Sequence, residues 1–324
     1  MPSLEPLDSL VVDVLLDNNS DNYSSKPAHV SPEFNNVIKA GAHQLSGATL
    51  CCAQLGLSLM LTARSGDRRH KLLFDAGPEG GLLVRNCKNL GVTLGDVEAV
   101  AISHGHWDHM GALIDMLDEI TRIGRSVPVH VNPGMFLERG ARLSDGGVAP
   151  FEPVPSVETI TSHGGAVVNH PGERTVLEDF FYISGEIPRV TDFEKGRQDH
   201  LCRENAETEW RPDPLLMDER YLAAHIKNKG MMVFSACSHA GIINVMHSVK
   251  RTFPNIPLYG VFGGLHLVGT LEQIIPQTIE GFREFKPAQI MPAHCTGFRA
   301  HNALLNAFGE SIVVPSAVGS RYNF

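Results

Sequence analysis

The chain has 324 residues, of which 43% are hydrophobic and 19% are charged, and its formal net charge at pH 7 is −9. A chain of this length can bury a sizeable hydrophobic core, either in one large domain or in two small ones. The acidic balance argues against a protein that binds the phosphate backbone of nucleic acids.

The cysteines and the N-terminus indicate a cytoplasmic protein. Six cysteines occur without a Cys-x-x-Cys pair, which favours a reducing compartment. The first residues lack the basic region and the apolar run of a signal peptide. The most apolar window, residues 50–63, is interrupted by Gln and Gly and is too short to span a bilayer. We therefore expect no membrane partner.

The first part of the chain is predicted to consist mainly of strands. Residues 9–16 form an apolar run, and they precede a long loop, residues 20–47, that is rich in Ser, Asn, Pro and Gly. Two further apolar runs, residues 50–63 and 70–74, flank a polar turn and are typical of a hairpin. A helix is expected over residues 80–90.

The most informative stretch is Ser103-His104-Gly105-His106-Trp107-Asp108-His109. It follows a short apolar run, residues 97–102, that is typical of a buried strand, and it precedes a helix-like pattern over residues 110–117. Three imidazoles and a carboxylate therefore share one tight loop. Buried ionisable groups are costly unless they are paired or bind a metal, and these ligands suit zinc, iron or manganese. The loop predicts a metal site, in which Trp107 is expected to pack rather than react.

The middle of the chain gives weaker signals. After a short predicted strand at residues 127–131, Pro and Gly are scattered through residues 133–176. Glu186 and Arg189 lie near a predicted strand end, where they either face the pocket or form a salt-bridged turn. Residues 192–218 are strongly polar and are predicted to be an insertion, which acts either as a lid or as a surface loop.

Three later strands each end in a turn that carries a histidine. His239, His266 and His294 follow the predicted strands at residues 231–235, 257–262 and 288–291. With the loop at residues 103–109, four strands end in this way, and sites are often built where strands end on one edge of a layered α/β domain. A helix over residues 300–308 and a strand over residues 311–314 are expected to close the chain.

The motif His-x-His-x-Asp-His resembles the signature of the metallo-β-lactamase superfamily, and Phe74-Asp75-Ala76-Gly77 is similar to its strand followed by Asp-x-Gly. The motifs at residues 185–189, 237–241, 263–267 and 292–297 resemble one subgroup, that of 7,8-dihydropterin-6-methyl-4-(β-D-ribofuranosyl)aminobenzene-5'-phosphate synthase. The resemblance implies an α/β fold. It would be a single domain over residues 1–324, built as a four-layer αβ/βα sandwich of two mixed sheets flanked by helices, with the insertion at residues 192–218.

The resemblance also implies the metal ligands. His104 and His106 would hold one ion, and Asp108 and His109 would hold a second. His294 matches the last histidine ligand of the superfamily, which follows a late strand.

One strand end departs from the superfamily pattern. The usual Gly-Asp, whose carboxylate bridges two metal ions, is replaced by Ala236-Cys237-Ser238-His239. His239 is the candidate for the replacing ligand. Asp75 is expected to brace a ligand histidine, and His266 is expected to be either a ligand or a proton donor.

Together these features imply a metal-dependent hydrolase with one or two ions, zinc being expected and iron or manganese being alternatives. Such an enzyme uses a metal-activated hydroxide on an ester, lactone or phosphodiester-type small molecule. Asp108 would orient the nucleophile, and His266 would protonate the leaving group. Glu186 and Arg189 would bind the substrate.

Two alternatives stay open. One is a synthase-like transferase that joins a pterin to a ribosyl-aminobenzene phosphate, as the subgroup name suggests. The other is a non-catalytic sensor that binds metal and a small ligand, and it is disfavoured because the ligand residues of the motif are all present. A homo-oligomer is compatible with either enzyme.

Overall fold

The computed structural model describes residues 2–324, in which two mixed β-sheets form the centre of the fold. The first sheet has eight strands, in the spatial order β2 (Val30–Ser31), β18 (Arg321–Asn323), β1 (Ser9–Leu16), β3 (Ser58–Ser65), β4 (Arg68–Phe74), β5 (Ala99–Ala101), β6 (Val127–Val131) and β9 (Gly165–Asn169). The second sheet has six strands, in the order β10 (Arg174–Val176), β11 (Phe181–Ile183), β14 (Leu222–Ile226), β15 (Gly230–Ser235), β16 (Leu258–Gly264) and β17 (Gln289–Ala293).

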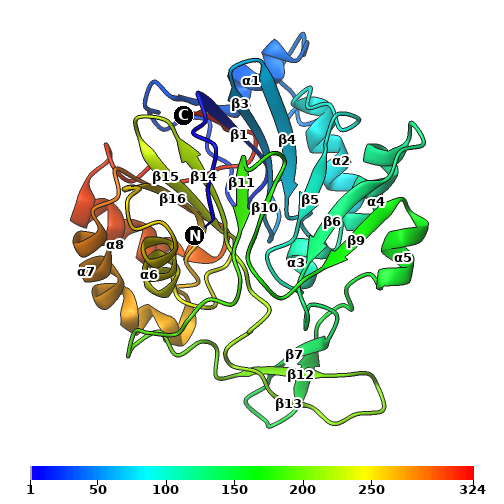
Figure 1. Ribbon diagram of the computed structural model, residues 1–324, viewed down its shortest axis with the longest axis vertical. Helices are drawn as coiled ribbons and strands as arrows, with labels where there is room; N and C mark the ends of the chain where they lie inside the picture. Colours follow the sequence, from blue (N-terminus) through cyan, green and yellow to red (C-terminus); the bar gives the residue numbers. More distant parts are fainter. Residues whose placement is uncertain (1) are drawn as a thin grey trace.

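Helices cover the outer faces of both sheets (Figure 1). The first sheet is covered by α2 (Gly80–Asn89), α4 (Leu113–Thr121) and α5 (Val157–Ser162), and the second by α6 (Ile242–Thr252), α7 (Ile275–Phe285) and α8 (Phe298–Phe308). Shorter helical segments are α1 (Glu33–Lys39), α3 (Trp107–Met110), η1 (Gly269–Ile274) and η2 (His294–Thr296). The predicted four-layer sandwich is confirmed.

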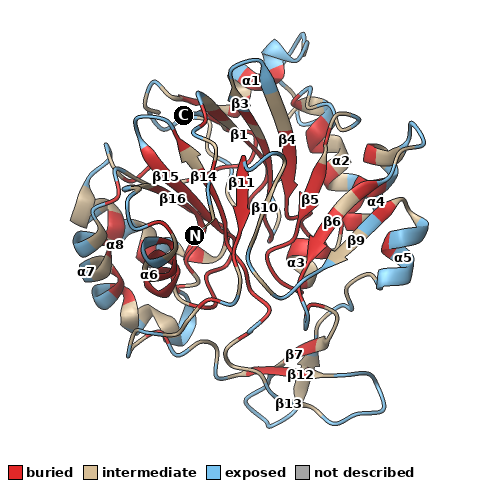
Figure 2. Ribbon diagram, viewed as in Figure 1, coloured by how far each residue is buried: buried red, intermediate tan, exposed pale blue. Residues whose placement is uncertain are grey.

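The central core lies between the two sheets. Phe74 of the first sheet packs near Phe234 of the second, with ring centroids 6.4 Å apart, and Phe234 in turn packs on Phe262. Figure 2 shows that the strands are buried along most of their length and that exposed residues gather on the helices and loops. Every residue of β15 is buried, because this strand has neighbours on both edges and is covered on both faces.

The strand directions bring distant loops to one place. β4, β5, β6 and β9 run parallel in the first sheet, and β15, β16 and β17 run parallel in the second. The carboxyl ends of parallel strands lie on the same edge of a sheet. The loops that follow β4 and β5 can therefore meet the loops that follow β15, β16 and β17.

A small third sheet lies below this edge in Figure 1. Its strands are β13 (Arg211–Pro212), β12 (His200–Arg203), β7 (Glu138–Arg142) and β8 (Val148–Pro150), in that order. The predicted insertion, residues 192–218, thus contributes two strands that pair with a hairpin of the weakly patterned segment 133–176. The insertion is tied into this sheet rather than being a free surface loop.

Two predicted strands differ from the structure. The predicted hairpin strand at residues 50–63 begins later, at Ser58, because the backbone of residues 51 and 52 bonds to side chains of Glu33 and Asn86 instead of a neighbouring strand. Residues 311–314 make an isolated bridge between Val313 and Ile290, and the chain closes instead with β18, which pairs with β1. Within residues 2–324, the helices are all too short or too polar to cross a bilayer.

Candidate metal centre

The histidine-rich loop leaves β5 and enters α3. His104 and His106 lie on the loop, and Asp108 and His109 lie in the first turns of α3. Gly105 between them has no room for a side chain, because a Cβ atom there would overlap the carbonyl oxygen of Met135. The glycine therefore lets the loop approach the backbone of Met135 closely.

Three turns from the second sheet meet this loop. His239 follows β15, His266 follows β16, and His294 follows β17. His266 has a φ of 46° and His294 a φ of 44°, in the left-handed region that residues with a Cβ rarely occupy. Such strained residues cluster at functional sites, where the surrounding structure holds them in place.

The first ligand group consists of His104, His106 and His239. Nε2 of His104 lies 3.0 Å from Nδ1 of His106. The ring of His239 lies 4.8 Å from that of His104 and 5.0 Å from that of His106, centroid to centroid. The three residues each offer one nitrogen within 4.8 Å of the others.

The second ligand group consists of Asp108, His109 and His294. Oδ2 of Asp108 lies 3.4 Å from Nε2 of His294 and 3.8 Å from Nε2 of His109. These distances are long for hydrogen bonds. They leave space for an ion that all three side chains can reach.

Cys237 lies between the two groups. Its Sγ is 3.2 Å from Nε2 of His109, and it forms a third compact set with His104 and His109. The sequence predicts that His239 replaces the bridging carboxylate of the superfamily. In the structure His239 completes the first group, and Cys237, at the strand end itself, occupies the position between the groups.

Cys237 also approaches a second thiol. Its Sγ lies 3.4 Å from Sγ of Cys295, and both cysteines form a compact set with His266. His266 therefore lies at the edge of the centre, beside the ring of His239 at a centroid distance of 4.5 Å.

Asp75 positions one histidine of each group, His109 directly and His104 through Ser103. The sequence predicts this role of Asp75 for one histidine. Its Oδ2 lies 2.7 Å from Nδ1 of His109 and accepts a hydrogen bond of 2.7 Å from the hydroxyl of Ser103. Because that hydroxyl proton is used, Ser103 Oγ accepts from Nδ1 of His104, 2.8 Å away. Both histidines therefore carry their proton on Nδ1 and direct Nε2 into the centre.

Asn18 plays the same part for His294. Its side-chain amide donates to the carbonyl oxygen of His294, and its Oδ1 accepts from the backbone N–H of Gly56. Oδ1 also lies 3.0 Å from Nδ1 of His294, so this nitrogen donates and Nε2 points to Asp108. A residue of the first loop thus fixes the last histidine of the predicted ligand set.

The surroundings favour the neutral form of the imidazoles in the first group and the charged forms of Asp108 and His294 in the second. Burial lowers the pKa values of His104, His106 and His239 well below the usual value. Burial works to raise the pKa of Asp108, but His109 and His294 outweigh it and lower the pKa to about 2. Burial likewise works against protonated His294, but Cys295 and Asp108 raise its pKa to about 9.

The donor set fits a metal ion. Within residues 2–324, both ring nitrogens of His239 and Nε2 of His294 are buried without a hydrogen-bond partner. Buried polar atoms are normally paired, and each unpaired atom needs an explanation. Imidazole nitrogens, a carboxylate and a thiolate are ligands of zinc sites, so a divalent ion would satisfy these atoms.

The centre lines a cavity of about 770 Å³. This volume is within the usual range for small-molecule sites. Its walls include Trp107, Phe151 and Arg197, the last of which is ion-paired to Asp199. Trp107, expected only to pack, thus borders the cavity, while Phe151 and Arg197 come from the small sheet and its connections and had no sequence signal.

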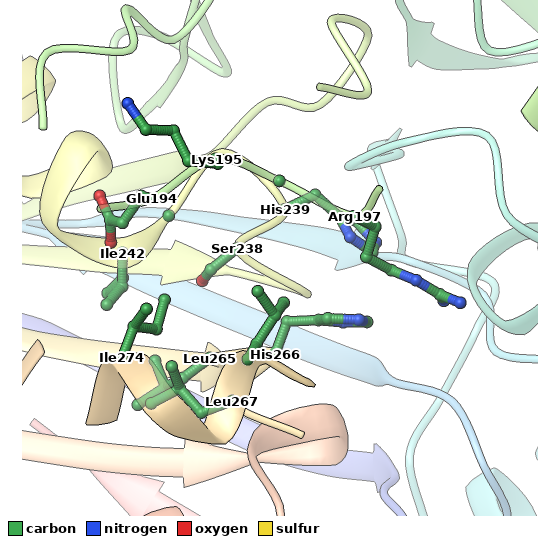
Figure 3. A pocket seen from close by; sticks show the side chains of 13 residues that line it. Glu194, Lys195, Arg197, Ser238, His239, Ile242, Leu265, His266, Leu267 and Ile274 are labelled. Carbon is green, nitrogen blue, oxygen red and sulfur yellow. The ribbon is translucent and has the colours of Figure 1, made fainter. Parts of the chain in front are cut away.

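A water-sized cavity of about 20 Å³ adjoins the centre (Figure 3). Figure 3 shows the rings of His239 and His266 and the guanidinium of Arg197 pointing to the same side. Glu194 points away from them, toward the start of α6.

Glu186 and Arg189, which are predicted to bind the substrate, lie outside the lining of the large cavity. Glu186 is exposed. The guanidinium of Arg189 donates to the backbone carbonyls of Ile187 and Leu215, so it stabilises a turn. Arg197 is the arginine that reaches the cavity.

Comparisons with known proteins agree with the fold. Residues 62–179 match the family model of the metallo-beta-lactamase superfamily, a span that includes Asp75 and the histidine-rich loop. The structure superposes with a TM-score of 0.70 on Tm1679, described as a metal-dependent hydrolase of the beta-lactamase superfamily, at 22% identity and over 96% of this chain and 98% of that chain. The metallo-beta-lactamase fold protein YhfI from Bacillus subtilis gives a TM-score of 0.50 at 10% identity, over 98% of this chain and 100% of that chain. Residues 62–179 are thus similar to the metallo-β-lactamase superfamily, and the chain has the fold of metallo-β-lactamase fold proteins.

A more specific likeness is to a named synthase. The chain is 28% identical over 268 residues to the 7,8-dihydropterin-6-methyl-4-(beta-D-ribofuranosyl)-aminobenzene-5'-phosphate synthase of Methanocaldococcus jannaschii, over 80% of this chain and 86% of the relative. The subgroup resemblance expected from the motifs is confirmed.

Proposed function

We propose that the chain is a metal-dependent hydrolase that cleaves an ester, lactone or phosphodiester-type bond in a small molecule. One observation carries the proposal: two groups of imidazole and carboxylate ligands, with Cys237 between them, face a cavity of about 770 Å³. A cavity of this size accepts a small molecule and can place one of its bonds next to the ligands.

Zinc is the ion that this donor set favours. The first group is all imidazole, and the second adds a carboxylate, with the thiol of Cys237 within reach of both. Zinc accepts nitrogen, oxygen and sulfur ligands together, whereas harder ions prefer oxygen. When bound, such an ion lowers the pKa of a water molecule and polarises the oxygen of the scissile bond.

Asp108 and His266 would handle the protons. The pKa of about 2 keeps Asp108 a carboxylate at neutral pH, so it accepts a hydrogen bond from the attacking water and orients it. His266 borders the same cavity, and its Nδ1 is buried with no partner among the described residues. It is placed to donate a proton to the leaving group.

The test is a panel of esters, lactones, phosphodiesters and sulfate esters, assayed with purified protein. We expect at least one to be hydrolysed, with the activity lost after chelation and restored by zinc. His106→Ala should abolish it, whereas His163→Ala, a change at a partly exposed histidine paired with Asp118, should not. Hydrolysis that survives chelation or His106→Ala would overturn the proposal.

A transferase of the synthase type is the second candidate, and two observations favour it. One is the 28% identity to the named synthase over most of both chains. The other is the cavity wall, where Trp107 and Phe151 offer flat apolar surfaces and Arg197 a cation. Such a wall suits a substrate with an aromatic ring and an anionic group.

The same preparation separates the two candidates. It would be incubated with a reduced pterin and a ribofuranosylaminobenzene phosphate, and the products would be identified by mass spectrometry. Condensation without hydrolysis of the panel would favour the transferase. Hydrolysis without condensation would favour the hydrolase.

A further inference from the structure

His200 is a buried histidine in contact with a predicted metal ligand. It is the first residue of β12, in the small third sheet, and its side chain is 0% exposed. Its Nε2 lies 2.8 Å from Nε2 of His106, and its Nδ1 lies 3.1 Å from the backbone carbonyl oxygen of Asp213. The superfamily motif does not include this residue.

These two contacts determine which nitrogens carry protons. A carbonyl oxygen only accepts, so Nδ1 of His200 must be the donor. Burial favours the neutral ring, and a neutral imidazole carries one proton, so Nε2 of the fully buried His200 is an acceptor. Nε2 of His106 must therefore carry a proton and donate it to His200.

The consequence is a free lone pair on Nδ1 of His106. That atom faces Nε2 of His104 at 3.0 Å, and the proton of His104 is held on its other nitrogen by Ser103. Two lone pairs at this distance repel unless a cation lies between them. Nitrogen ligands of a tetrahedral zinc ion with bonds of ~2.0–2.1 Å are about 3.3 Å apart, close to the separation here.

A second contact links the same loop to the small sheet, through Asp218 and an arginine of β7. Oδ2 of Asp218 accepts a hydrogen bond of 2.9 Å from the backbone N–H of Gly105, which lies between His104 and His106. The guanidinium of Arg139 in β7 binds Asp218 at 2.7 Å and Asp213 at 2.8 Å. Arg139 thus links Asp218, which positions Gly105, to Asp213, whose backbone carbonyl orients His200.

We propose that His200 is a positioning residue for the metal site, and that it holds His106 in the tautomer whose Nδ1 binds the ion. The inference rests on the metal site of the proposed function. It gives the small sheet a role as a support for the first ligand group. Loss of an outer hydrogen-bond partner of this kind weakens metal binding by roughly 10- to 100-fold.

The test measures zinc affinity of metal-free protein by competition with a chromophoric chelator, with no activity readout. His200→Phe keeps a planar ring but has no acceptor, and we expect its affinity to fall by roughly 10- to 100-fold. His200→Gln provides a carbonyl oxygen as acceptor and should recover part of the loss. His130→Phe, a change at a buried histidine that contacts Arg174 instead, is the matched control and should bind zinc as the wild type does.

A second measurement needs no variant. Nitrogen-15 NMR of the metal-free wild type should show the proton of His106 on Nε2 and that of His200 on Nδ1. Unchanged zinc affinity in His200→Phe, or a proton on Nδ1 of His106, would overturn the role of His200 while leaving the metal site intact. A wild type that binds no zinc would instead overturn the metal site itself and, with it, this inference.

Discussion

Oδ2 of Asp75 lies 2.7 Å from Nδ1 of His109, and the same oxygen accepts the hydroxyl proton of Ser103, which in turn accepts from His104. One buried carboxylate therefore orients an imidazole of each ligand group. Its second oxygen accepts the backbone N–H of Ser103, so the start of the histidine-rich loop is fixed as well.

Replacing Asp75 with Asn should weaken both groups at once. Both carboxylate oxygens of Asp75 accept hydrogen bonds, from the backbone and hydroxyl of Ser103 and from His109. The NH2 group of an amide cannot accept, so at least one of these three hydrogen bonds is lost. We expect zinc affinity to fall by roughly 10- to 100-fold, measured by chelator competition. Asp96→Asn, at a partly exposed aspartate paired with Lys71, is the control and should leave the affinity unchanged.

Asp108→Ala should remove one ion from a two-ion centre. Elemental mass spectrometry of the purified protein should give about two ions per chain for the wild type and about one for the variant. Turnover should be lost because no other carboxylate of the second ligand group can orient the water. A variant that keeps full turnover would contradict a two-metal mechanism.

The two cysteines of the centre should behave differently. Cobalt substituted for zinc gives a thiolate-to-metal charge-transfer band in the near ultraviolet when a cysteine binds it. Cys237 lies between the ligand groups, so Cys237→Ser should abolish the band, whereas Cys295→Ser should retain it. Loss of the band in Cys295→Ser alone would contradict the prediction, because it would show that Cys295, and not Cys237, binds the metal.

Glu194 should give the fold a measurable pH dependence. Its carboxylate caps α6 by accepting the backbone N–H groups of Ile243 and Asn244 at 2.9 and 2.8 Å. Burial nevertheless raises its pKa from the usual 4.5 to about 7, despite the opposing hydrogen bonds. The folded state therefore holds this proton more tightly than the unfolded state, and the stability that depends on it falls as the pH rises from 4.5 to 7.

The size of that effect follows from the shift in pKa. Each pKa unit corresponds to about 1.4 kcal/mol, so the free energy of unfolding should lose about 3 kcal/mol across this range. Glu194→Gln does not titrate. Both proteins would be unfolded with urea at pH 4.5 and at pH 8. The unfolding free energy of the wild type minus that of the variant should be lower at pH 8 by this amount. A constant difference would show that Glu194 has an ordinary pKa.

The sequence predicted those parts of the centre that are close together along the chain or that end a strand. One loop contains His104, His106, Asp108 and His109. So many ionisable side chains directly after a buried strand are not expected unless they bind a metal. His294 was found because an apolar strand precedes it. The structure brings all of these side chains into compact sets, and His106, Asp108 and His294 line one cavity.

The remaining parts depend on pairings that local patterns do not encode. β12 pairs with β7 across about 60 residues of sequence, and both strands are short and polar, so the approach of His200 to the loop had no signal. Cys237 was overlooked as the residue between the groups because a single thiol is weaker evidence of a ligand than an imidazole. Arg197 lies in a polar segment with no strand end to mark it, so nothing in the sequence indicates that it reaches the cavity.

The proposed ligands come from both sheets, with His104, His106, Asp108 and His109 after strands of the first and Cys237, His239 and His294 after strands of the second. Neither half of the chain carries a complete set. An ion held this way is bound tightly only after the last parallel strand has docked, since a metal site absent from the unfolded chain couples binding to folding. Metal uptake during synthesis would therefore mark the moment at which the chain has finished folding, and a stalled or truncated chain would be left without its ions.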